Sequence, residues 1–73
     1  MAQEKVEVPI TGKIISIDVK VGDTIKEGDI ICILESMKME NPITSPVDGT
    51  VTEISITEDQ VVKPGDIIAV IEY

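Results

Sequence analysis

The chain carries the stretch GDIICIL at residues 28–34 and a near copy, GDIIAVI, at residues 65–71. Each is a continuous apolar run of strand length that follows a Gly-Asp break, a pattern typical of a strand covered on both faces and not of a helix. The match extends without a gap, so that residues 6–35 align with residues 43–72 at a constant offset of 37. The pattern therefore predicts two similar halves joined by a short connector.

The composition favours β-strands. The chain has 14 Ile and 9 Val among its 73 residues, lacks Phe and Trp, and has one Tyr. Side chains branched at Cβ are stiff and pack well on pleated strands, and no segment shows helical periodicity. A chain of this length supports one small core. We therefore expect residues 1–73 to form a single domain, with repeat halves 6–35 and 43–72 joined by a hairpin at residues 36–42.

Two repeats are too few for a solenoid, which needs at least three to bury a continuous core. They can instead face each other about an approximate two-fold axis, so that each half covers the apolar face of the other. This predicts an all-β fold, a flattened barrel-sandwich (hammerhead) of two small antiparallel sheets with quasi-two-fold symmetry. It also predicts that the two termini lie close together and far from the connector.

Alternating apolar residues predict the other strands. One is expected over residues 5–10, with Pro9 at an edge or end position because proline cannot donate to a ladder. In the next segment, alternation with polar residues places one set on a single face: Ile15, Ile17, Val19 and Val21. The second half is expected to have strands over residues 43–47, bent at Pro46, and over residues 51–56.

Two tetrapeptides predict turns at equivalent places. Lys63-Pro64-Gly65-Asp66 places Pro and Gly at the two central positions, the pairing that a type II turn requires. Lys26-Glu27-Gly28-Asp29 aligns with it. Both halves are therefore expected to turn in the same way before their long apolar strand.

The net charge of −8 limits the classes of partner. Nucleic acid would be repelled where Lys or Arg must neutralise phosphates, and an anionic membrane surface is disfavoured for the same reason. The N-terminal residues lack the apolar run of a signal peptide, and no stretch approaches the length of a membrane span. We expect neither nucleic-acid binding nor membrane insertion.

Cys32 is the one cysteine of the chain, and it aligns with Ala69 in the second half. A small buried side chain is the favoured interpretation, over a reactive thiol. Because the chain has no His and one Cys, a zinc site or a Cys-His catalytic site cannot be assembled within it. A reducing cytoplasm fits this composition best.

The connector has the sequence ESMKMENP at residues 35–42. A tight hairpin is the economical link between the two halves, and Asn41-Pro42 supplies turn chemistry, which puts Lys38 at or near an exposed tip. Most exposed lysines are solvated charges, and most methionines fill cores. A hairpin tip, however, offers Met37 and Met39 little core to enter. Exposed methionines are more typical of a surface that another protein recognises.

The stretch ESMKME at residues 35–40 resembles the attachment motif of biotinyl domains, the biotin carboxyl carrier proteins and related biotin/lipoyl attachment proteins, in which a Lys lies between two Met residues. Residues 19–29 resemble the segment that leads to the family's biotin hairpin. Residues 45–51 resemble the segment that follows it, and residues 63–66 also match, so that nearly the whole chain is covered. The chain has no room for the protruding thumb of some bacterial members and resembles the thumbless type.

The resemblance implies a role for each residue of the motif. Lys38 would be acylated by a biotin protein ligase, and the attached biotin would carry a carboxyl group from a biotin carboxylase site to a carboxyltransferase or decarboxylase site. Met37 and Met39, with Glu35, Ser36 and Glu40 around them, would be recognition residues. The chain would be a non-catalytic carrier, expected to be monomeric when isolated.

Two positions depart from the biotinyl pattern and leave alternatives open. Ser36 stands where biotinyl domains most often have Ala, and Glu35 lies three residues before Lys38, an arrangement common in lipoyl domains. A lipoyl carrier of a 2-oxoacid dehydrogenase-type system, with lipoate on Lys38, is therefore the second hypothesis, and acceptance of both groups by Lys38 is left open. The third is an unmodified β docking module whose lysine has no special chemistry.

Overall fold

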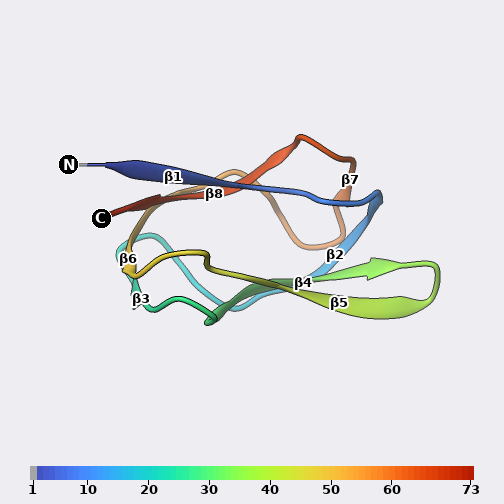
Figure 1. Cartoon of the computed structure of the whole chain (residues 1–73). Coiled ribbons are helices and arrows are strands. Elements are labelled where there is room, and N and C mark those ends of the chain that lie inside the picture. The colour runs from blue at the N-terminus through green and yellow to red at the C-terminus, as the bar shows by residue number, and fades with distance from the viewer. Residues whose placement is uncertain (1) are drawn as a thin grey trace.

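Eight strands form two antiparallel four-stranded sheets in the computed structural model, which describes residues 2–73 (Figure 1). The strands are β1 Gln3–Glu7, β2 Gly12–Ile17, β3 Thr24–Ile25, β4 Ile30–Ser36, β5 Met39–Thr44, β6 Gly49–Ile54, β7 Val61–Val62 and β8 Ile67–Glu72. One sheet has the strand order β1-β8-β6-β3 and the other β5-β4-β2-β7. The described residues contain no helix, and so none that could span a membrane. The predicted all-β sandwich is confirmed.

The two termini lie together at one end of the molecule, which is 36 Å long, and the β4–β5 hairpin lies at the other (Figure 1). Ala2 and Tyr73 exchange two backbone hydrogen bonds, each with an N···O distance of 2.9 Å. The predicted placement of the ends is therefore confirmed.

The strand registers show the quasi-two-fold symmetry directly. In the β4–β5 pair Glu35 lies opposite Glu40, and in the β8–β1 pair the residues at the same offset, Glu72 and Gln3, lie opposite each other. The β2–β4 and β6–β8 pairs also match at every register position. Both halves therefore repeat their hydrogen-bonding pattern as well as their sequence.

The core lies between the two sheets and consists mainly of aliphatic side chains. Its largest fully buried members are Ile14, Ile31, Leu34, Ile68, Ile71, Val51 and Val62. Burial of each such side chain contributes about 1.5–3 kcal/mol.

The predicted alternation over residues 15–21 is partly wrong, because β2 contains a β-bulge. The register passes from Ile14 opposite Leu34 to Ser16 opposite Ile33, which leaves Ile15 as an extra residue. Ile15 is accordingly 38% exposed, whereas Ile14 is fully buried. A bulge of this kind reverses the alternation of the strand. Val21 is also exposed, because β2 has ended before it.

Three predicted strand boundaries also differ from the structure. β1 ends at Glu7, so Val8 is buried beyond the strand and Ile10 is exposed; Pro9 lies just past the end of an edge strand, as expected. β5 ends at Thr44, so Pro46 lies in the following loop and does not bend a strand. β6 spans Gly49–Ile54, two residues earlier than expected.

Both predicted turns are present. Gly28 and Gly65 have φ values of 90° and 94°, and in each turn the Asp backbone N–H donates to the Lys carbonyl three residues earlier. Positive φ at the third position is the mark of a type II turn and favours glycine. The Asp carboxylates of both turns also accept from the Lys backbone N–H, at 2.9 and 3.0 Å. These bonds fix the direction in which β4 and β8 begin.

Candidate functional site

The hairpin tip consists of two residues, Met37 and Lys38. The last paired residues of the hairpin are Ser36 in β4 and Met39 in β5. Met37 and Lys38 have φ values of 54° and 67°. Positive φ at both central residues is the conformation of a type I′ turn, whose twist matches that of the flanking strands. The expectation that Lys38 lies at the tip is confirmed.

The expected turn at Asn41-Pro42 is wrong, because both residues lie in β5. Asn41 is opposite Leu34 and Pro42 is opposite Ile33. Pro42 is accommodated because β5 is an edge strand, where a missing N–H breaks no ladder bond. The Asn41 side chain donates to the Met39 carbonyl at 3.2 Å and so supports the strand beside the tip.

The tip is held in a conformation that its residues do not favour. The left-handed region costs most side chains about 1–2 kcal/mol per residue, and a type I′ turn normally uses Asn-Gly. Met37 and Lys38 adopt it because β4 and β5 are already paired on both sides. The backbone beneath Lys38 is therefore determined by the strand register and not by local preference.

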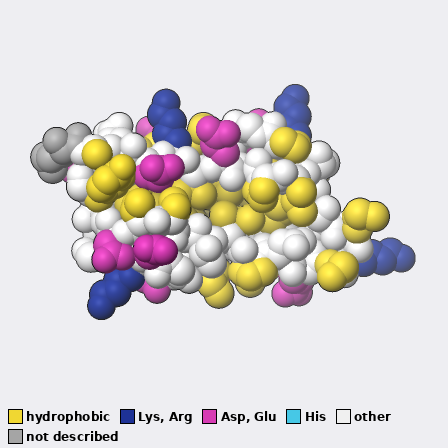
Figure 2. Space-filling view, viewed as in Figure 1, with side chains coloured by type: hydrophobic (Ala, Val, Ile, Leu, Met, Phe, Trp, Pro, Cys, Tyr) yellow, Lys and Arg dark blue, Asp and Glu magenta, His cyan; other side chains and the backbone are white. Residues whose placement is uncertain are grey.

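Lys38 is exposed and carries an uncompensated charge. Among residues 2–73 the salt bridge found joins Lys13 to Asp59, so no carboxylate lies within bonding distance of the Lys38 ammonium. Figure 2 shows a basic side chain projecting beside hydrophobic side chains at the hairpin end of the molecule. The stem and amine of Lys38 are thus free to enter another protein's site.

The side chains around Lys38 form two faces. Glu35 and Glu40 are exposed and directly opposite each other, on the face of the hairpin that points away from the sandwich. Ser36 and Met39 are also opposite each other and share the other face. Met37 is 92% exposed and Met39 68%, which confirms that neither fills the core. The site thus has an acidic face, an apolar face and one cation at the tip.

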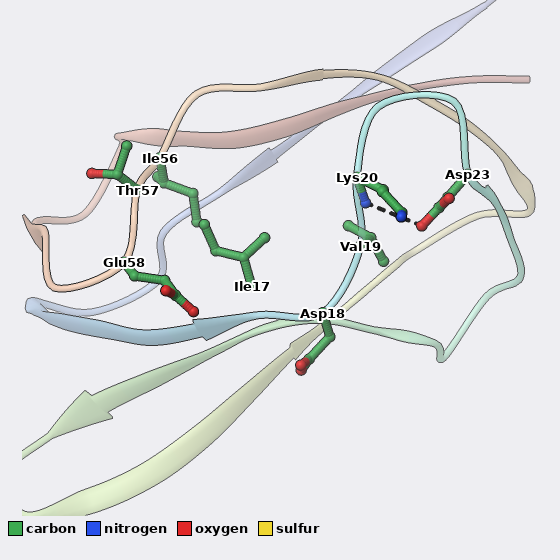
Figure 3. Close-up of a pocket in the computed structure, with 8 residues that line it drawn as sticks. All are labelled: Ile17, Asp18, Val19, Lys20, Asp23, Ile56, Thr57 and Glu58. Carbon is green, nitrogen blue, oxygen red and sulfur yellow. Dashed lines mark hydrogen bonds between the residues drawn. The ribbon is translucent and has the colours of Figure 1, made fainter.

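An open cleft of about 520 Å³ lies away from the hairpin, between residues 17–23 and residues 56–58 (Figure 3). Ile17, Val19 and Ile56 supply its apolar lining, and its charged residues are Asp18, Lys20, Asp23 and Glu58. The Asp23 carboxylate already accepts a hydrogen bond from the Lys20 backbone N–H at 3.1 Å. Asp18 and Glu58 are exposed to solvent. Thr57 also lines the cleft, and its hydroxyl lies 3.4 Å from the side-chain oxygen of Gln60.

Cys32 is fully buried in β4, as the sequence indicated. Burial, and to a lesser extent the negative charge of Asp18, raises the pKa of the Cys32 thiol to about 11. The reactive form of cysteine is the thiolate. Cys32 therefore acts as a small core residue, and the exposed amine of the hairpin is that of Lys38.

The sequence of this chain is similar to parts of known proteins. The gamma subunit of glutaconyl-CoA decarboxylase from Acidaminococcus fermentans is 53% identical over 38 residues, which cover 52% of this chain and 26% of that subunit. The gamma subunit of methylmalonyl-CoA decarboxylase from Veillonella parvula is 45% identical over 42 residues, covering 58% of this chain and 33% of that subunit. The matched residues thus span a third or less of these relatives' length.

The fold is also that of a known structure. Urea carboxylase from Kluyveromyces lactis superposes with a TM-score of 0.91 at 30% identity, over 99% of this chain and 6% of that one. The sequence model of the biotin/lipoyl family, described as "Biotin-requiring enzyme", matches residues 4–71. Because that match covers nearly all of the 73 residues, the chain belongs to the biotin/lipoyl family of biotin-requiring enzymes.

Proposed function

We propose that residues 1–73 form a single biotin carboxyl carrier domain in which Lys38 is the attachment residue. The observation that carries this proposal is the exposed lysine at a two-residue tip, between two exposed methionines, in a chain that belongs to this family. A covalent biotin fits the site because the Lys38 amine is solvent-exposed and has no ion-pair partner among residues 2–73. Rigid strands behind the tip hold the amine in a reproducible place.

The attachment step uses the amine of Lys38 as a nucleophile. In the site of a biotin protein ligase, its nitrogen attacks the carboxyl carbon of biotinyl-adenylate, an amide bond forms, AMP leaves and the amine loses a proton. The attached biotin then supplies a nitrogen that carries a carboxyl group between two active sites. The chain itself catalyses neither the loading nor the unloading of that carboxyl group.

The residues around Lys38 serve recognition. Met37 and Met39 offer flexible apolar contacts, which suit a surface that must fit several enzymes in turn. Ser36 keeps the position beside Met39 small, and the Glu35–Glu40 pair gives the opposite face a negative charge. The partners are a biotin protein ligase, a biotin carboxylase and a carboxyltransferase or decarboxylase. We expect the domain to be located in the cytoplasm. When isolated, it is expected to be a monomer.

The names of the two decarboxylase relatives point to one class of system. Glutaconyl-CoA decarboxylase and methylmalonyl-CoA decarboxylase are both named for an acyl-CoA substrate. We therefore propose that this domain serves an acyl-CoA carboxylase or decarboxylase. The acyl group of the substrate is selected by the partner enzyme, because the carrier holds only the carboxyl group.

The decisive experiment is the intact mass of the chain produced with a biotin ligase, followed by peptide mapping of its six lysines, Lys5, Lys13, Lys20, Lys26, Lys38 and Lys63. One biotin on Lys38 is expected. Lys38→Arg should abolish the adduct, whereas Lys63→Arg, which changes another exposed turn lysine, should retain it. An adduct that persists on Lys38→Arg would refute the site.

Lipoylation of Lys38 is the alternative that Glu35 favours, because an acidic residue shortly before the lysine is the lipoyl-like feature of the motif. The same mass measurement with a lipoate ligase tests it. A lipoyl adduct without a biotin adduct would replace the proposed function. A chain that takes neither group would instead be an unmodified docking module.

A further inference from the structure

The two thioethers at the hairpin tip are open to solvent, whereas the chain's single thiol is not. Met37 is 92% exposed and Met39 68%, while Cys32 is fully buried. Oxidants react with accessible sulfur, and among cysteines with the thiolate form. The pKa of Cys32, raised to about 11, keeps its thiol protonated at neutral pH. Among residues 2–73, peroxide is therefore expected to react with the sulfur atoms of Met37 and Met39.

Neither methionine supports the fold. Met37 lies in the turn, and Met39 is the first residue of β5, opposite Ser36, and neither belongs to the buried cluster. Oxidation of a core methionine inserts a polar oxygen among apolar side chains and disrupts packing. At Met37 and Met39 the added oxygen would face water. Their oxidation is thus separable from unfolding.

Both methionines do flank Lys38 directly in the sequence, and they supply the apolar surface at the tip. A sulfoxide is polar and chiral, and its oxygen is a strong hydrogen-bond acceptor. An enzyme surface that accepts the thioethers would leave this oxygen without a partner, which is costly. Oxidation of either sulfur therefore changes the surface that a ligase contacts around the Lys38 amine.

We propose that Met37 and Met39 form a reversible oxidation site, at which conversion of the thioethers to sulfoxides slows the transfer of biotin to Lys38 and leaves the fold intact. This inference rests on the proposed carrier function. With hydrogen peroxide as oxidant, a sulfur lone pair attacks one peroxide oxygen, the O–O bond breaks, an S–O bond forms and water is released. Sulfur loses two electrons, and a methionine sulfoxide reductase with a thiol reductant returns them.

The test treats the purified, unbiotinylated chain with hydrogen peroxide, removes the oxidant, and maps the modified residues by mass spectrometry. Sulfoxides are expected on Met37 and Met39, with Cys32 unchanged and the melting temperature preserved. The kcat/KM of a biotin ligase for the treated chain should fall about tenfold, which corresponds to about 1.4 kcal/mol. Treatment with both types of methionine sulfoxide reductase should restore it.

Leucine variants provide the matched control, since leucine keeps an apolar side chain and lacks sulfur. The double variant Met37→Leu, Met39→Leu retains Met1 and Cys32, so its ligation rate after peroxide should equal its rate before. The single variants assign the effect to one sulfur or to both. A double variant that still loses ligation after peroxide would place the sensitive group elsewhere and overturn the proposal.

Three other outcomes separate this inference from the proposed function. If the untreated chain is biotinylated and the doubly oxidised chain is biotinylated equally fast, the oxidation site is refuted and the carrier function stands. If oxidation lowers the melting temperature in parallel with ligation, the effect is structural and the proposal fails. If the untreated chain takes no biotin, the proposed function fails, and this inference fails with it.

Discussion

The two ends of the sandwich are built on the same strand pairing, but only one is closed by a turn. At the hairpin end, Ser36 pairs with Met39 and a two-residue turn follows. At the other end, the residues at the same offset, Tyr73 and Ala2, exchange backbone hydrogen bonds and no turn joins them. The scaffold therefore forms this strand end with or without a connection. What distinguishes the functional end is the dipeptide Met37-Lys38 and its neighbours.

The side chains next to the two ends differ more than their backbones do. Glu40 and Met39 have the counterparts Gln3 and Ala2. The acidic pair and the second methionine are therefore features of the hairpin alone, while the paired backbone beneath them is common to both ends. The paired backbone and the side chains of the hairpin can therefore be changed independently of each other.

The largest effect is expected on biotinylation, when a circular permutation exchanges the open and closed ends. A circular permutant that joins Tyr73 to Ala2 through Asn-Gly, the preferred type I′ dipeptide, and opens the chain between Met37 and Lys38 should fold. It should lose biotinylation completely, because Lys38 no longer lies on a closed turn. Circular dichroism and intact mass measure the two properties.

A second permutant provides the control for this exchange. It has the same Asn-Gly closure but opens between Glu58 and Asp59, in an exposed turn. With the hairpin preserved, it should be biotinylated like the parent. Full biotinylation of the first permutant would mean that a closed tip is unnecessary.

The next largest effect is expected on stability, when a methyl group is added near either end of the sandwich. A Cβ atom added at Gly12 would clash with the Glu35 carbonyl oxygen, and one at Gly49 would clash with the Glu72 carbonyl oxygen. Gly12→Ala and Gly49→Ala should each lower the free energy of unfolding by about 3 kcal/mol, since a neighbouring backbone must move. Urea denaturation measures this.

Gly28→Ala is the matched control for these glycines. Nothing lies within 4 Å of its Cβ, and its cost of about 1 kcal/mol comes from the positive φ alone. If the two ends are equivalent, the values for Gly12 and Gly49 should agree within about 1 kcal/mol. A larger difference between these two losses of stability would show that the closed end and the open end do not accommodate the added methyl group equally.

A smaller difference between the halves lies at Cys32, whose counterpart is Ala69. The folded chain keeps the Cys32 thiol protonated up to a pKa of about 11, whereas an unfolded thiol ionises near 9.0. Between these values the folded state binds more protons, so stability is full below pH 9 and is lost as the pH rises through 11.

Cys32→Ala should remove this contribution to the pH dependence. Its free energy of unfolding should therefore fall less between pH 8 and 11 than that of the parent, by on the order of 1–2 kcal/mol. Parallel curves for the two proteins would show that the thiol does not contribute. Denaturant unfolding over this pH range is the measurement.

The smallest effect is expected at the turn itself. Met37→Asn places a residue that tolerates the left-handed region at φ 54°, and should raise the free energy of unfolding by about 0.5 kcal/mol. Thermal melting measures the gain. The same variant should slow ligation, because it removes an exposed apolar side chain. An unchanged ligation rate would contradict a recognition role for Met37.

The repeat, the strand class and the exposed lysine could all be predicted from the sequence. The Gly-Asp breaks and the apolar runs at residues 28–34 and 65–71 are local signals, and each required only a few neighbouring residues to interpret. The two methionines were informative because a connector between two halves has no core to fill. The family motif around Lys38 could be recognised for the same reason, since it is contiguous.

The strand register, and with it the position of the turn, the bulge and the need for glycine, depends on tertiary contacts. The turn lies at Met37-Lys38 and not at Asn41-Pro42, because burial of Leu34 and Ile43 aligns β4 with β5 and leaves two residues to close them. The bulge at Ile15 depends on how β2 meets β4. The need for glycine at positions 12 and 49 depends on carbonyl groups distant in the sequence. Local propensity carries no information on such contacts, because they exist only after the strands have paired.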